Sequence, residues 1–96
     1  MGKEENDVES YLHSQITKLH GTTRKWVSPG RAGVPDRICM LPEGRVFFVE
    51  VKTLSGKLSV RQKREMESLA ELGCNVHTVY GRQGVDDFIR GLDVTP

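Results

Sequence analysis

The chain lacks any long apolar run. No segment of its 96 residues approaches the roughly 18 consecutive apolar residues that a membrane-spanning helix needs. The acidic start, with Glu4, Glu5 and Asp7 close to Met1, is unlike the positively charged start of a secretory signal peptide. A composition that is 36% hydrophobic and 28% charged is typical of a soluble globular protein, and we expect a single domain over residues 1–96.

Cysteine is scarce and histidine forms no pattern. Cys39 and Cys74 lie far apart with no C-x-x-C spacing, and the three histidines show no metal-ligand spacing. These absences argue against a disulfide framework and against a zinc site. We expect both cysteines to be buried thiols in a reducing cytosol.

An excess of one charge is also missing, because the formal net charge is only +1. The distribution is uneven, however. Residues 10–64 hold eleven lysines or arginines against three acids, a net charge of +8, whereas residues 1–9 carry −3 and residues 65–96 carry −4. A basic centre between acidic ends is compatible with a face that binds a polyanion. The alternative is that these charges scatter over the surface.

Hydrophobic periodicity and turn residues predict an α/β fold. The predicted elements are helices at 6–19, 59–72 and 85–92, strands at 22–27, 36–41, 45–52 and 75–80, and loops at 28–35, 42–44 and 81–84. The second helix opens with Ser59 and Gln62 in the S-x-x-Q form of a capping box. A right-handed strand–helix–strand crossover would place the last strand parallel to the third.

Three charged residues converge in this arrangement. Glu50 and Lys52 interrupt the apolar strand "FFVEVKT" two positions apart, so they point to one face. The hairpin turn at 42–44 brings Asp36 beside them, because antiparallel pairing joins the start of one strand to the end of the next. Two neighbouring carboxylates repel unless a cation lies between them, and oxygen ligands suit Mg²⁺. The alternative is a surface salt bridge; the glycine and proline before Asp36 favour the metal site.

The sequences "GVPD" at 33–36 and "VEVK" at 49–52 resemble the PD-(D/E)XK nuclease superfamily. With an acid in the first helix and the Ser-x-x-Gln that opens the next, the pattern resembles the VRR-NUC branch, the virus-type replication-repair nucleases. The resemblance covers roughly residues 9–88. It implies an αβββαβ(α) restriction-endonuclease-like core, in which helices flank a mixed central sheet.

The resemblance also implies roles for individual residues. Asp36, Glu50 and the backbone carbonyl of Val51 would bind Mg²⁺, for which Mn²⁺ would substitute. Lys52 would be the catalytic lysine, and Gln62 would reach the site from the start of its helix. Glu9 matches the helix acid that can hold a second metal or its water, although Glu4, Glu5 and Asp7 crowd the same turn.

Two basic clusters flank the carboxylates in the sequence, and their contacts would read the nucleic-acid backbone rather than the bases. The predicted nucleic-acid-binding residues are Arg24, Lys25, Arg31, Arg37, Lys57, Arg61, Lys63 and Arg64. Trp26 is either a base-stacking residue or part of the core. No nucleotide cofactor is expected, because the P-loop-like "SGKLS" at 55–59 has Leu58 where Ser or Thr should hold Mg²⁺.

The resemblance, together with the charge pattern, implies a Mg²⁺-dependent, structure-selective DNA endonuclease similar to the Holliday-junction resolvases. The resemblance also implies a location in the cytoplasm of a bacterial or phage-infected cell. We expect a homodimer, with Trp26, Val27, Phe88 and Ile89 as candidate interface residues. Two alternatives stay open at this point: the same chemistry on flaps, nicks or RNA, and a catalytically idle nucleic-acid-binding module.

Overall fold

The computed structural model describes residues 3–93 as a four-stranded sheet covered unequally by three helices. Residues 1–2 and 94–96 of the predicted domain lie outside the described residues. The elements are α1 (Lys3–Lys18), β1 (Thr22–Lys25), β2 (Arg37–Leu41), a 3₁₀ turn (Pro42–Gly44), β3 (Arg45–Lys52), α2 (Val60–Glu71), β4 (Val76–Tyr80) and α3 (Gly81–Asp93). No helix in this part of the chain is long and apolar enough to cross a membrane.

The sheet has the order β1-β2-β3-β4, in which only the β3–β4 pair is parallel. The parallel pairing confirms the predicted crossover through α2. Arg37 of β2 stands opposite Val49 of β3, so Asp36, just before β2, lies level with the end of β3 that carries Glu50. The sheet topology therefore brings the two acids together, as the hairpin predicts.

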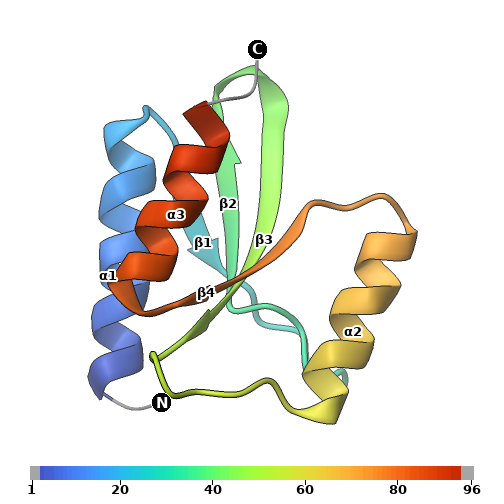
Figure 1. The fold of residues 1–96 in the computed structure, drawn as a ribbon. Helices are drawn as coiled ribbons and strands as arrows, with labels where there is room; N and C mark the ends of the chain where they lie inside the picture. The colour runs from blue at the N-terminus through green and yellow to red at the C-terminus, as the bar shows by residue number, and fades with distance from the viewer. Residues whose placement is uncertain (1–2, 94–96) are drawn as a thin grey trace.

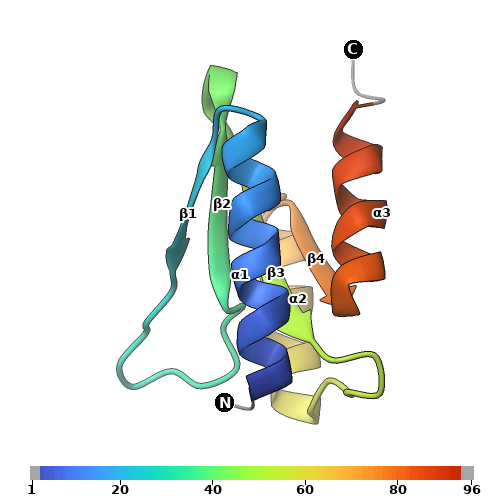
Figure 2. The same ribbon diagram turned by 90° about the vertical axis from the view of Figure 1, so that its left-hand side faces the viewer.

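The hydrophobic core lies between the sheet and the α1–α3 pair, which share one face of the sheet (Figures 1 and 2). Side chains of β2, β3 and β4 that point to this face alternate with residues of the other face. The core residues are Val8, Leu12, Ile16, Cys39, Leu41, Val49, Val51, Val79, Val85, Phe88 and Leu92. Burial raises the pKa of Cys39 to about 12, which leaves this thiol unreactive; Cys74 is half-buried and also free.

The opposite face of the sheet is covered only by α2, which stands apart from the other helices in Figure 1. Trp26 packs on Phe48 there, with ring centroids 5.1 Å apart, which favours the core interpretation of Trp26 over base stacking. Val60 and Leu72 at the two ends of α2 are 66% and 80% exposed. The buried residue of α2 is an acid, Glu65, so polar contacts contribute to holding this helix in place.

The predicted loop at 81–84 is wrong, because α3 already begins at Gly81. Two of its glycines have other roles: Gly81 has φ +66°, a left-handed conformation that favours glycine, and Gly84 packs closely against the end of β4. A Cβ atom at Gly81 would lie 2.8 Å from Leu54 Cγ, and one at Gly84 would lie 3.1 Å from the backbone carbon of Val79. In addition, α1 begins three residues earlier than predicted, β1 ends at Lys25, and Asp36 precedes β2 instead of belonging to it.

Candidate active site

Glu50 is a buried acid at the centre of the candidate site. It lies near the end of β3 on the sheet face that α2 covers, and only 2% of the residue is exposed. The pKa of its carboxyl is raised to about 7, mainly by burial and then by the charge of Asp36, whereas Lys52 acts in the opposite direction. A carboxylate in such a position is costly to ionise without a compensating cation.

Asp36 approaches the same position from the loop before β2. Its Oδ2 accepts a hydrogen bond from the backbone N–H of Val51 over 2.8 Å, which ties the carboxylate to the end of β3. The pKa of Asp36 is raised by burial; the bond from Val51 opposes this rise, and the charges of Glu9 and Glu5 add to it. Asp36 also lies close enough to Glu50 for its charge to disfavour ionisation of Glu50.

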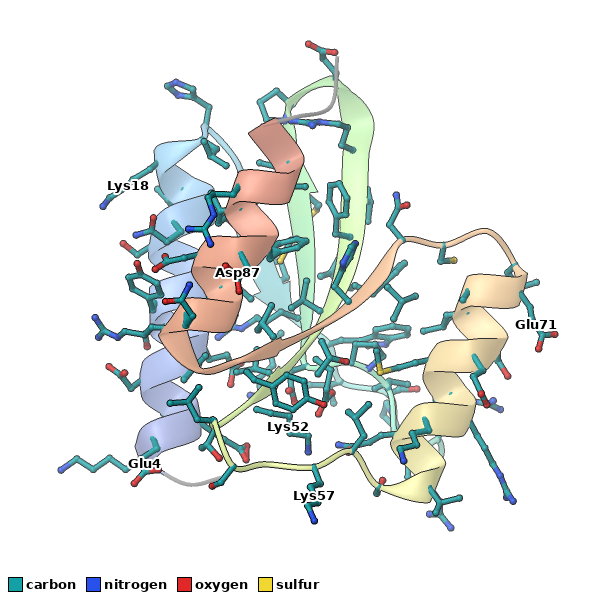
Figure 3. All side chains as sticks on the ribbon, viewed as in Figure 1. Glu4, Lys18, Lys52, Lys57, Glu71 and Asp87 are labelled. Atoms are coloured by element: carbon teal, nitrogen blue, oxygen red, sulfur yellow. The ribbon has the colours of Figure 1, made fainter. Side chains whose placement is uncertain are left out.

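Lys52 and Gln62 both contact one oxygen of Glu50. Lys52 Nζ lies 3.5 Å from Glu50 Oε2, and Gln62 Nε2 donates a hydrogen bond to that oxygen over 2.9 Å. The Lys52 side chain is 14% exposed and points toward the end of the sheet at the bottom of Figure 3. The predicted capping box is confirmed, since Ser59 Oγ accepts from the N–H of Gln62 and Gln62 Oε1 accepts from the N–H of Ser59.

The donor set fits a hard cation such as Mg²⁺. Within residues 3–93, no hydrogen bond engages Asp36 Oδ1 or Glu50 Oε1, which leaves one oxygen of each carboxylate for an ion. No cluster of three or more His, Cys, Asp or Glu side chains suited to a metal occurs in this described part of the chain. Two carboxylates with few further protein ligands suit Mg²⁺, which keeps several of its waters. The backbone of Val51 also lies at this position, through its bond to Asp36.

Glu9 is buried beside the site but is already paired with two cations. Its Oε1 lies 2.7 Å from Arg37 Nε and 3.3 Å from Lys25 Nζ. Glu9 still raises the pKa of Asp36, so it is close to the carboxylate pair. Its role as a ligand of a second metal stays a prediction.

Glu5 lies close to the site, although none of the sequence motifs includes it. This half-buried acid lies one helical turn before Glu9 on α1, and its charge raises the pKa of both Asp36 and Glu50. The i, i+4 spacing of Glu5 and Glu9, which places both on one face of the helix, was a signal in the sequence. The start of α1 therefore adds negative charge to the candidate metal centre.

The eight predicted nucleic-acid-binding residues fall into two groups. Lys25 and Arg37 pair with Glu9, Arg31 pairs with Glu65 over 2.7 Å, and Arg24 donates to Thr22 Oγ1. Four others lie in or just before α2 and, like Arg24, make no ion pair with another described residue: Lys57, Arg61, Lys63 and Arg64. Of the eight predicted residues, most of those outside ion pairs therefore lie around the first turns of α2.

Comparison with known proteins identifies the family of this chain. The family profile of the VRR-NUC domain matches residues 3–83. A protein of Acyrthosiphon pisum secondary endosymbiont phage 1, named "Putative nuclease p44", is 44% identical over 72 residues, which cover 75% of this chain and 77% of the phage protein.

Two solved structures share the fold. A structure titled "VRR_NUC domain" is 33% identical with a TM-score of 0.86, covering 93% of this chain and 97% of its own. A second, titled "VRR_NUC domain protein", is 18% identical with a TM-score of 0.70, covering 94% and 88%. This chain is a nuclease domain and belongs to the VRR-NUC family.

Proposed function

We propose that this protein is a Mg²⁺-dependent endonuclease that hydrolyses phosphodiester bonds in DNA and selects branched structures. The observation that supports the proposal most directly is the environment of Glu50. A second carboxylate, Asp36, disfavours its ionisation, while Lys52 and Gln62 approach one of its oxygens. Two neighbouring carboxylates suit a divalent cation, and a lysine beside them suits the phosphate that this cation would also bind.

When bound by Asp36 and Glu50, Mg²⁺ would polarise the phosphate and make water a better nucleophile. The protein groups have separate tasks. The N–H of Val51 holds Asp36 Oδ2, and Gln62 Nε2 holds Glu50 Oε2, so both carboxylates keep a fixed orientation. The ammonium of Lys52, 3.5 Å from Glu50, is placed to stabilise negative charge on the attacking oxygen or on the phosphate.

The surrounding positive charge supports a nucleic-acid substrate. The lysines and arginines at the start of α2 suit a phosphate backbone, which they would bind without reading base sequence. One set of Asp36, Glu50 and Lys52 cuts one strand at a time. Resolution of a four-way junction needs two symmetric cuts, which favours a two-fold homodimer with both sites on a common face.

Fewer of the candidate residues are available for a dimer interface than the sequence indicates. Phe88 belongs to the core and Ile89 packs against it, so they are poor interface residues. Trp26 is half-buried against Phe48. Val27, by contrast, is 73% exposed and remains available.

A panel of labelled substrates tests the proposal. Four-way junction, flap, fork, nicked duplex, linear duplex and single-stranded RNA would be incubated with Mg²⁺, Mn²⁺ or EDTA. We expect cleavage only with a divalent ion, and paired nicks in opposing strands of the junction. Cleavage of flaps or plain duplex as fast as junctions would contradict the junction preference, and metal-independent cleavage would contradict the chemistry. Binding without cleavage under all conditions would support the idle-module alternative.

A further inference from the structure

A basic cleft separate from the carboxylates lies between α2 and the loop of residues 28–34. It has a volume of about 320 Å³ and is lined by Gly30, Arg31, Ala32, Arg61, Arg64, Glu65 and Ser68. Three arginines and one acid give it a net charge of +2. We propose that this cleft binds a backbone phosphate of the substrate strand, and that Glu65 positions Arg31 for this contact. The inference rests on the proposed function and adds a second contact point to it.

The arrangement of α2 separates the cleft from the catalytic centre. Residues 61, 64, 65 and 68 share one face of the helix at i, i+3, i+4 and i+7, and all four line the cleft. Gln62 points instead to Glu50. The helical rise from residue 61 to residue 68 is about 10 Å, comparable with about three nucleotides of one DNA strand. This face of α2 is therefore long enough to lie along about three nucleotides of one strand.

Glu65 is the feature that makes the cleft a built site. It is 8% exposed, and its Oε1 accepts from Arg31 Nε at 2.8 Å and lies 2.7 Å from an Arg31 terminal nitrogen. The Arg31 side chain remains 64% exposed, so its remaining N–H groups can bind a ligand. A guanidinium held on one edge by a carboxylate presents its other donors in a fixed direction, which favours a bidentate phosphate contact.

The loop itself is held tightly against α2. A Cβ atom at Gly33 would lie 2.9 Å from the carbonyl oxygen of Arg61, and Gly33 has φ +89°, a conformation that other residues rarely adopt. Asp36 follows this loop after Pro35. The contact therefore links the cleft to the segment that carries Asp36.

Binding measurements test the cleft independently of catalysis. Affinity for a fluorescein-labelled four-way junction would be measured in EDTA across a salt series, so that no cleavage interferes. Arg31→Ala, Arg61→Ala and Arg64→Ala should each weaken binding several-fold and lower the salt slope by about one. Lys18→Ala is the matched control, because Lys18 is an exposed base on α1, across the molecule from α2 (Figure 3); its slope should not change. Slopes that fall equally in all four variants would overturn the proposal.

The Glu65→Gln variant separates two explanations of DNA binding by the cleft, because they predict opposite changes in affinity. It removes a negative charge, so general electrostatic attraction predicts tighter binding, whereas loss of the Arg31 orientation predicts weaker binding. We expect weaker binding, and Arg31→Lys should also bind weakly because lysine keeps the charge without the planar fork. Thermal unfolding would confirm that both variants fold. Tighter binding by a folded Glu65→Gln variant contradicts the positioning role.

Modified DNA identifies the phosphate. A neutral methylphosphonate would replace one phosphate at a time near the cut bond. At one or two of these positions it should weaken DNA binding by the wild-type protein. At the same positions it should not weaken binding by Arg61→Ala further, because that variant has already lost the contact. Junctions with 5′-phosphate or 5′-hydroxyl ends should bind equally. A preference for the 5′-phosphate that depends on Arg61 would show that the cleft takes a terminal phosphate and would overturn the backbone contact. If the wild-type protein binds DNA through the cleft but never cleaves it, the proposed function is refuted and the proposal of the cleft is not.

Discussion

Gln62 contacts the helix start and the candidate active site at the same time. Its Oε1 accepts from the N–H of Ser59 to close the capping box, and its Nε2 donates to Glu50 Oε2 over 2.9 Å. The start of α2 and the orientation of Glu50 therefore depend on one side-chain amide. The two tasks can be separated by mutation.

Ser59→Ala should destabilise the protein by about 1 kcal/mol, because it removes the cap on the N–H of Gln62. Cleavage should be retained, because the bond to Glu50 remains. Gln62→Ala should have a similar cost in stability but should also lower the single-turnover cleavage rate. Urea unfolding and rapid-quench kinetics on both variants check this. Equal activity in the two variants would mean that the bond between Gln62 and Glu50 has no catalytic role.

Asp36→Asn and Glu50→Gln should each abolish Mn²⁺ binding and lower cleavage by at least about 100-fold, because the ion supplies several kcal/mol of charge stabilisation. Both variants should fold, since removing either charge relieves the repulsion between the two acids. Isothermal titration with Mn²⁺ measures the binding. Asp87→Asn on the exposed surface of α3 is the control and should bind normally. Normal binding by both site variants would refute the metal assignment.

Stability without metal should fall as pH rises from about 4.5 to 7. The pKa of Glu50 is about 7 in the folded protein against an ordinary 4.5, so across this range the folded state holds a proton that the unfolded state has lost. The expected loss is on the order of 2 kcal/mol. Urea unfolding in EDTA at pH 5 and pH 8 measures it. Glu50→Gln should reduce the difference, whereas Glu71→Gln at the exposed end of α2 should not.

Divalent ions should reverse this trend. Since the ion and the proton compete for Glu50, Mn²⁺ affinity should rise between pH 6 and pH 8, and added Mn²⁺ should stabilise the protein most at the upper end. A Mn²⁺ affinity independent of pH would show that Glu50 is not a ligand.

Lys52→Ala should leave DNA affinity within a few-fold of wild type but lower the single-turnover rate by roughly 100-fold, since Lys52 acts on charge that develops in the transition state. Lys63→Ala, in the exposed first turn of α2, should do the opposite: weaker binding, a lower salt slope and an unchanged rate at saturation. Loss of affinity with a normal rate in Lys52→Ala would reverse these assignments.

The protein should be a homodimer that nicks opposing strands of a four-way junction. Light scattering after size exclusion, over a concentration series, should give about twice the mass of one chain. Val27→Asp places a charge on an exposed apolar position and is a first test of the interface. A strict monomer that cuts junctions no faster than linear duplex would refute the resolvase interpretation without affecting the metal-dependent chemistry.

Local patterns in the sequence were sufficient to predict the central part of the candidate site. Alternation along β3 puts Glu50 and Lys52 on one face, and the hairpin turn sets Asp36 against the end of the same strand. Gln62 was predictable because a capping box is complete within four residues. These relationships depend on backbone geometry over short distances, and the parallel β3–β4 pairing follows from a general rule on crossovers.

Tertiary structure alone decided which charged side chains pair across the fold. Glu9 meets Arg37 across 28 positions and Arg31 meets Glu65 across 34, and neither pairing has a local sequence signal. The start of α3 was also decided by tertiary structure. Its glycines are typical of a loop in the sequence, but in the fold they lie close to Leu54 and Val79. Periodicity determines which face of an element a residue occupies. The distant side chain that this residue contacts depends on how the elements pack. A long charged side chain can reach several partners, and the positions of the backbones determine which partner is within reach.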